Sequence, residues 1–277
     1  MARQDRRPVD ELIQLYVLEG FLARLTQTPF AERFVLKGGM LLAALGERRP
    51  TRDIDLQTST TSGDTGTVLT AVRQIADTPL SDGVVFDLGT VAAREIRDED
   101  IYPGVRVTMT ARLATARAHF HVDVSAGDPI TPPAQQVRIP RLLGGEITAR
   151  GYPLAMVYSE KIVTAVARGT VNTRWRDFAD MHLLTRRHPV DGTQLCHSVH
   201  GVARHRRVSL RPLAEVLVGY GDIGLQRWAA WRAKQRLGDR LPERFHDVVT
   251  AATDFADPAI TRTAAGHSWD PGTGTWS

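Results

Sequence analysis

Two short segments, FVLKGGM at residues 34–40 and TRDIDLQ at residues 51–57, decide how this 277-residue chain folds. In the first, an apolar run ends at Gly38-Gly39 and more apolar residues follow, which predicts a strand, a glycine turn and a helix. In the second, apolar residues alternate with Asp53 and Asp55, which is the period of a β-strand. Both carboxylates therefore point to one face of that strand, about 7 Å apart.

This pair of carboxylates predicts a metal site. Mg²⁺ prefers oxygen ligands and shares them with substrate phosphates, so Asp53 and Asp55 suit one or two such ions. Asp123 lies in another predicted strand and completes a cluster of three if the two strands are neighbours. Strand alternation favours Asp123, with Asp128 as the alternative third carboxylate. The competing interpretation, which explains most isolated Asp-x-Asp pairs, is a polar strand end with surface aspartates.

The remaining patterns predict an α+β protein with an α/β lobe at residues 1–150, a helical lobe at 151–265 and a flexible tail at 266–277. Before residue 150, the periodicities predict helices at 10–22 and 67–76 and strands at 84–86, 105–109, 120–124, 137–142 and 146–149. After it, apolar residues fall at helical spacing over 154–168, 174–187, 211–218, 222–236 and 243–255.

Composition excludes several classes of protein. With 42% hydrophobic and 24% charged residues, the chain is neither intrinsically disordered nor collagen-like. The single cysteine, Cys196, excludes an intrachain disulfide and a thiolate zinc site. No stretch approaches the roughly 18 apolar residues of a transmembrane helix, and the N-terminus has no apolar signal core. We therefore expect a cytoplasmic protein with no membrane partner.

The charged residues are unevenly distributed. Residues 1–150 carry 18 basic and 19 acidic side chains, whereas residues 151–277 carry 17 and 12, a mild bias toward an anionic partner for the second half. On charge alone, an ordinary soluble surface from an arginine-favouring genome is the preferred explanation of the bias. Only three of the 35 basic residues are lysines, at 37, 161 and 234. Because Lys37 and Lys161 fall in motifs, we expect that a compact ammonium is needed at both positions.

The second half holds a further ionic motif. Glu160-Lys161 lies in a predicted helix, and Asp177 and Asp180 lie on one face of the next. Lys161 is suited to hold phosphate charge, and Asp177 to orient Lys161 or accept a proton from an attacking hydroxyl. The alternative is a salt bridge that ties the two helices together. Asp180 is interpreted as structural, holding an arginine such as Arg174.

A histidine-rich segment at residues 197–207 attracts attention but gives no clear site. His197, His200 and His205 have metal-like spacing, yet the segment 197–207 itself contains no cysteine or carboxylate, which favours solvated or anion-facing histidines. The arginines of the same segment are suited to contact RNA phosphates. A solvated helix end explains them equally well.

The glycine and aspartate motifs resemble a known family. Gly38-Gly39 followed by Asp53-x-Asp55 resembles the signature of DNA polymerase β-like nucleotidyltransferases. The finer pattern, LKGG at 36–39 with Arg49-x-Thr51-x-Asp53-Ile54-Asp55, is similar to the AbiEii/AbiGii toxin family, which includes the MenT-type toxins. Gly39 stands where the superfamily usually has serine. The Glu-Lys pair and the Arg-Asp-x-x-Asp-Leu helix resemble the family's later motifs.

The resemblance implies a mixed-sheet nucleotidyltransferase lobe, a helical C-terminal lobe and an active site between them. It implies a Mg²⁺- or Mn²⁺-dependent toxin of a toxin–antitoxin pair that transfers a nucleoside monophosphate from an NTP to RNA, with the tRNA 3′ acceptor end favoured, and so blocks translation. A cognate antitoxin protein or an antitoxin kinase is the implied partner. The alternatives are a small-molecule acceptor such as an aminoglycoside, a protein hydroxyl, or a nucleotide-binding module without catalysis.

The resemblance also assigns roles to residues. It implies catalytic roles for Asp53, Asp55, Lys161 and Asp177, metal binding by Asp53, Asp55 and Asp123, and nucleotide binding by Lys37, Gly38, Gly39 and Lys161. Thr51 is a candidate for regulatory phosphorylation. Satisfying the backbone of a turn is an equally simple role for the Thr51 hydroxyl.

Overall fold

The computed structural model describes residues 7–58, 64–97 and 103–277. The chain forms two compact units, one made of Met1–Gly127 and Ala134–Tyr152 and the other of Asp128–Pro133 and Pro153–Ser277. Most of the second unit thus follows Tyr152, but the short segment 128–133 also belongs to it. The fold is α+β, as the sequence predicts.

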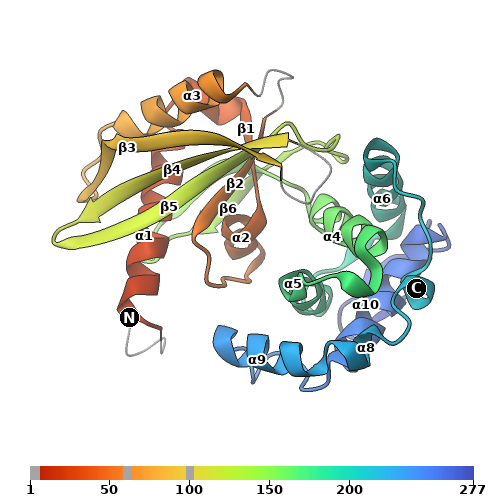
Figure 1. The fold of residues 1–277 in the computed structure, drawn as a ribbon. Helices are drawn as coiled ribbons and strands as arrows, with labels where there is room; N and C mark the ends of the chain where they lie inside the picture. The colour runs from red at the N-terminus through yellow and green to blue at the C-terminus, as the bar shows by residue number, and fades with distance from the viewer. Residues whose placement is uncertain (1–6, 59–63, 98–102) are drawn as a thin grey trace. The chain divides into compact units, whose positions relative to one another are not determined.

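A mixed seven-stranded sheet forms the centre of the first unit among the described residues, in the order β3-β4-β5-β2-β1-β7-β6 (Figure 1). β1 is antiparallel to β2 and parallel to β7, and β2 is parallel to β5. The remaining neighbours, β3 with β4, β4 with β5 and β6 with β7, are antiparallel. The strands span β1 Phe34–Lys37, β2 Asp53–Thr58, β3 Val84–Arg97, β4 Pro103–Leu113, β5 Ala116–Ser125, β6 Gln135–Pro140 and β7 Glu146–Gly151.

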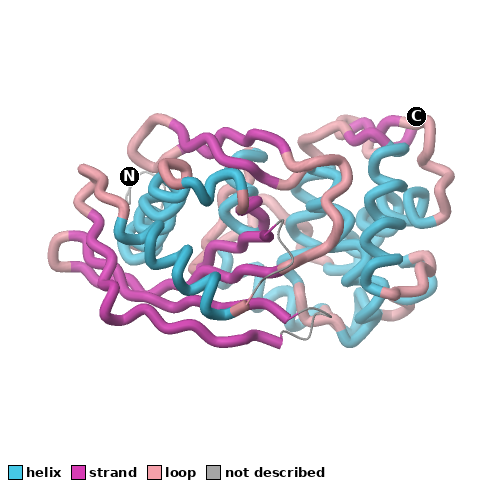
Figure 2. Tube along the Cα trace, turned by 90° about the horizontal axis from the view of Figure 1, so that it is seen from above, coloured by secondary structure: helices cyan, strands magenta, loops and turns pink. Residues whose placement is uncertain are grey.

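Helices α1 (Val9–Leu25) and α3 (Thr65–Asp77) pack against this sheet (Figures 1 and 2). The ring of Phe21 on α1 lies 6.0 Å from the rings of both Phe86 and Phe120. Along β5, Phe120, Val122 and Val124 are buried and alternate with more exposed polar residues. The aromatic contacts therefore identify the apolar face of the sheet, and the polar residues of β5 point to the other face.

The predicted strand–glycine turn–helix is confirmed at the start of this unit. η1 (Pro29–Glu32) leads into β1, and α2 (Gly38–Leu42) with η2 (Ala43–Leu45) follows β1 directly. Gly38 has a φ of +63°, in the left-handed region that residues with a Cβ rarely adopt. Glycine is therefore required at the point where the chain leaves the strand.

The second unit is mainly helical, as the sequence predicts. An aromatic core fills it: the rings of Trp175, Phe178 and Trp228 each lie within 5.7 Å of the ring of Phe245. The periodicity did not predict α6. The elements are α4 Leu154–Arg168, η3 Gly169–Val171, α5 Trp175–Thr185, β8 Val190–Asp191, α6 Gly192–Arg206, α7 Leu213–Val216, α8 Tyr220–Ile223, α9 Leu225–Gln235, α10 Phe245–Ile260, β9 Ser268–Asp270 and β10 Thr275–Trp276.

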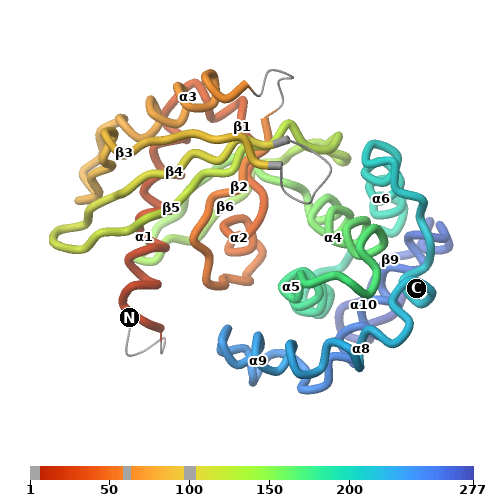
Figure 3. Tube along the Cα trace, viewed as in Figure 1, coloured from red at the N-terminus to blue at the C-terminus, as the bar shows by residue number. Residues whose placement is uncertain are grey.

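The prediction of a flexible tail at residues 266–277 is wrong. β9 pairs with β8 and β10, and in Figure 3 it runs beside α10. The indole of Trp269 is buried, and its Nε1 donates to the carbonyl of Thr185 at 2.7 Å. The ring of Trp276 stacks on Phe255 at 5.5 Å. Glycine and threonine made this segment look unstructured, but two tryptophans bury enough apolar surface to fix it.

In the described part of the chain, no helix has the length and apolar character needed to cross a membrane.

Candidate functional site

A row of charged side chains crosses the open face of the first unit's sheet. In the strand register, Lys37 on β1 is opposite Asp55 on β2, which is beside Asp123 on β5. Asp123 is opposite Arg106 on β4, which is opposite Arg94 on β3. Directly opposed residues point to the same face of a sheet, so the five side chains form one row. We call Lys37, Asp55, Asp123, Arg106 and Arg94 the charged row.

The charged row lies on the face that α1 does not cover. Ile54 and Leu56, which alternate with the carboxylates along β2, are fully buried, whereas Asp53 and Asp55 are half-buried. Period-two alternation therefore separates an apolar face, which holds the unit together, from a charged face that solvent and a ligand can reach.

The two glycines of the turn make room for the side chains beside them. A Cβ on Gly38 would lie 1.8 Å from Oδ2 of Asp55, and a Cβ on Gly39 would lie 2.7 Å from Oγ1 of Thr51. No side chain fits at either position without displacing its neighbour. The hydroxyl of Thr51 thus fills the space that a serine at position 39 would occupy, which explains the second glycine.

Two side chains flank the carboxylate of Asp53. The hydroxyl of Thr51, which is itself buried, donates a hydrogen bond to Oδ1 of Asp53. Nε2 of His121 lies 3.8 Å from Oδ2 of Asp53 and 3.7 Å from Oδ2 of Asp123. That nitrogen is buried and makes no hydrogen bond to any residue that the structure describes. His121 was not predicted from the sequence: the alternation of β5 gives its face, but only the strand register places it between two carboxylates.

Asp123 lies beside Asp55, as strand alternation favoured, and it is held by an arginine. Nε and Nη2 of Arg106 donate to its two carboxylate oxygens at 2.8 and 2.7 Å. The alternative, Asp128, belongs to the second unit, where Arg206 donates to it. Arg106 was not predicted from the sequence because no local pattern reveals which residue lies across from Asp123.

The donor set suits a metal ion held by two carboxylates. Asp53 and Asp55 share one face of β2, and Mg²⁺ is commonly bound by one or two carboxylates together with water and substrate phosphates. Within residues 7–58, 64–97 and 103–277, no group of three or more His, Cys, Asp or Glu side chains is arranged to hold a metal. Asp53 and Asp55 would therefore be the protein's ligands, and Asp123 as a third ligand stays a prediction.

Lys37 adds a cation to the same face. Its Nζ lies 5.6 Å from the centre of the Tyr152 ring, and the Tyr152 hydroxyl donates to the side chain of Gln57. An aromatic face attracts an ammonium group, so Tyr152 helps to place Lys37 next to Asp55.

In the second unit, Lys161 lies within a compact ionic cluster. Its Nζ contacts Oδ1 of Asp177 at 2.9 Å and Oδ2 of Asp180 at 2.8 Å. Nε of Arg174 contacts the other oxygen of Asp177 at 2.8 Å. We call Lys161, Arg174, Asp177 and Asp180 the α4–α5 cluster. The interhelical salt bridge considered from the sequence is therefore present, and Asp180 accepts from Lys161.

The electrostatics of Asp177 follow from its neighbours. Burial alone would raise the pKa of its carboxyl group, but the charges of Lys161 and Arg174 outweigh burial and hold that pKa well below its ordinary value of 3.8. Asp177 is therefore ionised at neutral pH and is a weak proton acceptor, which favours a role in holding Lys161.

Comparison with known proteins agrees with this geometry. Residues 20–253 match the model of a family described as the nucleotidyl transferase AbiEii toxin of type IV toxin–antitoxin systems. The chain belongs to the AbiEii family. It is thus a nucleotidyltransferase toxin of a type IV toxin–antitoxin system, a family that generally uses an NTP and a divalent metal and that implies an antitoxin partner.

Solved structures show the same fold. A Helicobacter pylori protein described as a nucleotidyltransferase is 12% identical, with a TM-score of 0.50 over 92% of this chain and 96% of its own. JHP933 from Helicobacter pylori is 13% identical, with a TM-score of 0.51 over 92% of this chain and 94% of its own. No curated protein sequence matches the chain significantly.

Proposed function

We propose that this AbiEii-family enzyme uses Mg²⁺ or Mn²⁺ to transfer a nucleoside monophosphate from an NTP to RNA, with the tRNA 3′ acceptor end as the acceptor and pyrophosphate as the leaving group. A tRNA capped in this way cannot be aminoacylated, so translation stops in the cytoplasm where the toxin acts. The observation that carries the proposal is the placement of Asp53 and Asp55 on the open sheet face, with Asp55 against the Gly38 turn.

Nucleotidyl transfer depends on positioning and on neutralising phosphate charge. In the proposal, Asp53 and Asp55 bind the divalent metal, which when bound supplies positive charge to the triphosphate and to the attacking oxygen. Thr51 fixes the orientation of Asp53 through its hydrogen bond. Lys37 and the backbone of Gly38-Gly39 receive the phosphates. The carboxylate of Asp123 already accepts from Arg106. As a third metal ligand, Asp123 would therefore contact the metal and Arg106 with the same carboxylate.

Lys161 and Asp177 complete the proposed machinery. Lys161 steadies the charge of the triphosphate, and Asp177 and Asp180 hold its ammonium group in place. We assign Asp177 to positioning because its lowered pKa makes it a poor base. This assignment predicts that Asp177→Asn lowers turnover without adding a new pH dependence near neutrality.

An RNA acceptor is supported by charge. Residues 151–277 carry 17 basic and 12 acidic side chains, which favours a polyanion over a cationic small molecule such as an aminoglycoside. A protein hydroxyl is the other acceptor class that a nucleotidyltransferase can use.

The proposal is tested by label transfer. The purified chain is incubated with each α-³²P-labelled NTP, Mg²⁺ and total tRNA, and Asp55→Asn is the inactive control. We expect label on tRNA that disappears with the variant, with chelator, and with tRNA whose terminal ribose has been oxidised by periodate. Label on protein or on an aminoglycoside would identify the other acceptor classes. NTP binding by calorimetry with no transfer to any acceptor would show a binding module.

We also propose Thr51 as the site at which a partner kinase could silence the enzyme. Its hydroxyl is bonded to Asp53 and touches the space at Gly39, so a phosphate there places about two negative charges against the metal ligand. Co-expression with the adjacent open reading frame, followed by mass spectrometry of the peptide containing Thr51, tests this. An unmodified Thr51 in a neutralised toxin would show that the antitoxin works by another route.

A further inference from the structure

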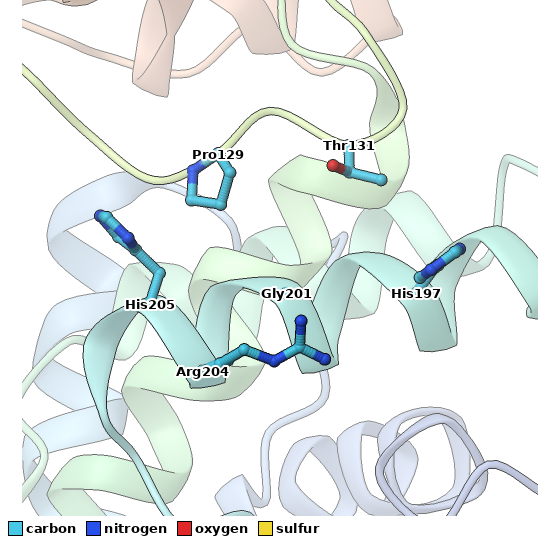
Figure 4. A pocket seen from close by; sticks show the side chains of 6 residues that line it. All are labelled: Pro129, Thr131, His197, Gly201, Arg204 and His205. Atoms are coloured by element: carbon cyan, nitrogen blue, oxygen red, sulfur yellow. The ribbon is translucent and has the colours of Figure 1, made fainter.

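A pocket of about 440 Å³ lies within the second unit, where the segment 128–133 faces α6. Pro129 and Thr131 form one wall, and side chains of α6 form the other (Figure 4). The α6 residues are His197, Gly201, Arg204 and His205. They are spaced at i, i+4, i+7 and i+8, so they share one face of the helix. None of the assigned catalytic, metal or nucleotide residues lines this pocket.

Its wall is held in place by buried ionic contacts. Nε and Nη2 of Arg206 donate to the carboxylate of Asp128, with the shortest contact at 2.5 Å, and Nη1 of Arg206 donates to Thr164 at 3.0 Å. Asp128 is only 2% exposed. These contacts fix the start of the segment 128–133 to α6 and α4, so the pocket has a defined shape.

Basic side chains line the pocket, and the space beside Gly201 is unfilled. His197, Arg204 and His205 are exposed, and none of the residues that line the pocket is acidic. The nearby acids are already paired, because Asp128 and Glu160 both contact Arg206. A Cβ built on Gly201 would have no heavy atom within 4 Å, so space remains between the basic side chains. The chemistry selects an anion with several acceptor oxygens.

We propose that this α6 pocket binds the phosphate backbone of the acceptor RNA. The inference rests on the proposed RNA acceptor and adds the place where that RNA is held. A guanidinium and two imidazoles offer donors to phosphate oxygens, and such contacts set the register of a nucleic acid without reading its sequence. None of the six residues that line the pocket is Phe, Tyr or Trp, the side chains on which bases stack, which favours a backbone phosphate over a base.

The test measures binding of total tRNA to the full chain by fluorescence anisotropy across a range of salt concentrations. Arg204→Gln is expected to weaken binding about tenfold and to reduce the slope of log K against log salt by about 1. Adding His197→Gln and His205→Gln to Arg204→Gln is expected to weaken tRNA binding further than Arg204→Gln alone. Arg227→Gln, an exposed arginine on α9, is the matched control and should leave both quantities unchanged.

Other outcomes overturn the proposal. If Arg204 only offsets the negative end of the α6 dipole, Arg204→Gln lowers the melting temperature while RNA affinity and salt slope stay unchanged. If Arg204→Gln weakens binding of NTP or inorganic phosphate but not of tRNA, the pocket holds a free phosphate compound. If the wild type binds no tRNA, the pocket has no RNA to hold.

Label transfer separates this inference from the proposed function. In Arg204→Gln, the KM for tRNA should be raised. At saturating tRNA, this variant should transfer label at the wild-type kcat. Transfer to RNA with an unchanged KM would overturn the pocket assignment and leave the proposed function intact. Conversely, tRNA binding that depends on Arg204, with no transfer to RNA, would support the pocket and overturn the proposed reaction.

Discussion

The charged row of the sheet and the α4–α5 cluster contain the same residue types but place them in different environments. Each places two aspartates close to a lysine and an arginine. In the row, the side chains of Asp123 and Arg106 are 16% and 25% exposed, on a face with room for a ligand. In the cluster, the side chains of Asp177 and Asp180 are 9% and 3% exposed, and their partners join two helices.

The difference lies in what surrounds the carboxylates. A strand exposes every second side chain, so the charges of the row stand on a surface that a metal and phosphates can approach. Two packed helices enclose their facing side chains, so the charges of the cluster satisfy one another. We therefore expect substitutions in the row to cost activity with little loss of stability. Substitutions in the cluster should cost stability in addition to the turnover that Lys161 is proposed to support.

The largest expected effect comes from Asp55→Asn in the row. Losing one carboxylate that we propose to bind the metal should reduce label transfer at least about 10³-fold, roughly 4 kcal/mol of activation free energy. The melting temperature should stay within about 3 °C of wild type because Asp55 is half-buried on the open face. Asp87→Asn, on β3 of the same sheet, is the control. A stable, fully active Asp55→Asn would remove the row from catalysis.

Next comes Lys161→Met in the cluster. Removing the ammonium leaves Asp177 and Asp180 buried with less compensation, so the free energy of unfolding should fall by about 3 kcal/mol. All five tryptophans lie in the second unit, at 175, 228, 231, 269 and 276, so tryptophan fluorescence in urea reports its unfolding. Lys234→Met, on the exposed side of α9, should be neutral. Unchanged stability would show that the cluster does not join α4 and α5.

Gly38→Ala tests how closely the turn and the row are coupled. The new methyl group would overlap the Asp55 carboxylate, so label transfer should fall about 10²-fold, near 2.7 kcal/mol. Gly145→Ala separates this effect from backbone strain, because Gly145 also has a positive φ, +78°, but has no atom near a Cβ. Equal losses of activity in both variants would mean that strain, and not the displacement of Asp55, is responsible.

The smallest expected effect is a pH dependence of the second unit through His182. Burial lowers the pKa of His182 from 6.5 to about 4, and the charge of Arg186 adds to that shift. The folded unit therefore favours neutral His182, so this contribution to stability is present above pH 6.5 and is lost as pH falls toward 4. Between pH 7 and pH 5 the free energy of unfolding should fall by about 2 kcal/mol.

Tryptophan-detected urea unfolding at the two pH values measures this change. His182→Leu should flatten the pH dependence over this window. An unaltered pH dependence in His182→Leu would assign the dependence to other groups. Asp177 would not be among them, because its lowered pKa acts only at more acidic pH. The label-transfer activity of the row should not follow the same pH profile.

Local patterns predicted much of this molecule. The helical spacing at 154–168 gave the bounds of α4, and the alternation at 53–57 gave the face of the two aspartates. These features depend on neighbours a few residues apart, which the sequence shows directly. The same method failed at α6, where histidines and arginines dilute the apolar periodicity, and at Trp269, whose partner Phe255 lies on another element.

By itself, the sequence determined the two-part α+β organisation, the glycine turn, the Asp53-x-Asp55 strand and the family. Only the tertiary structure decided that Asp123 lies beside Asp55, that Arg106 and His121 surround it, and that Thr51 fills the space at Gly39. It also decided that Asp128 does not join the charged row and instead pairs with Arg206 beside the basic pocket. The physical reason is that periodicity is local, whereas strand order and register arise from contacts between residues far apart in the chain.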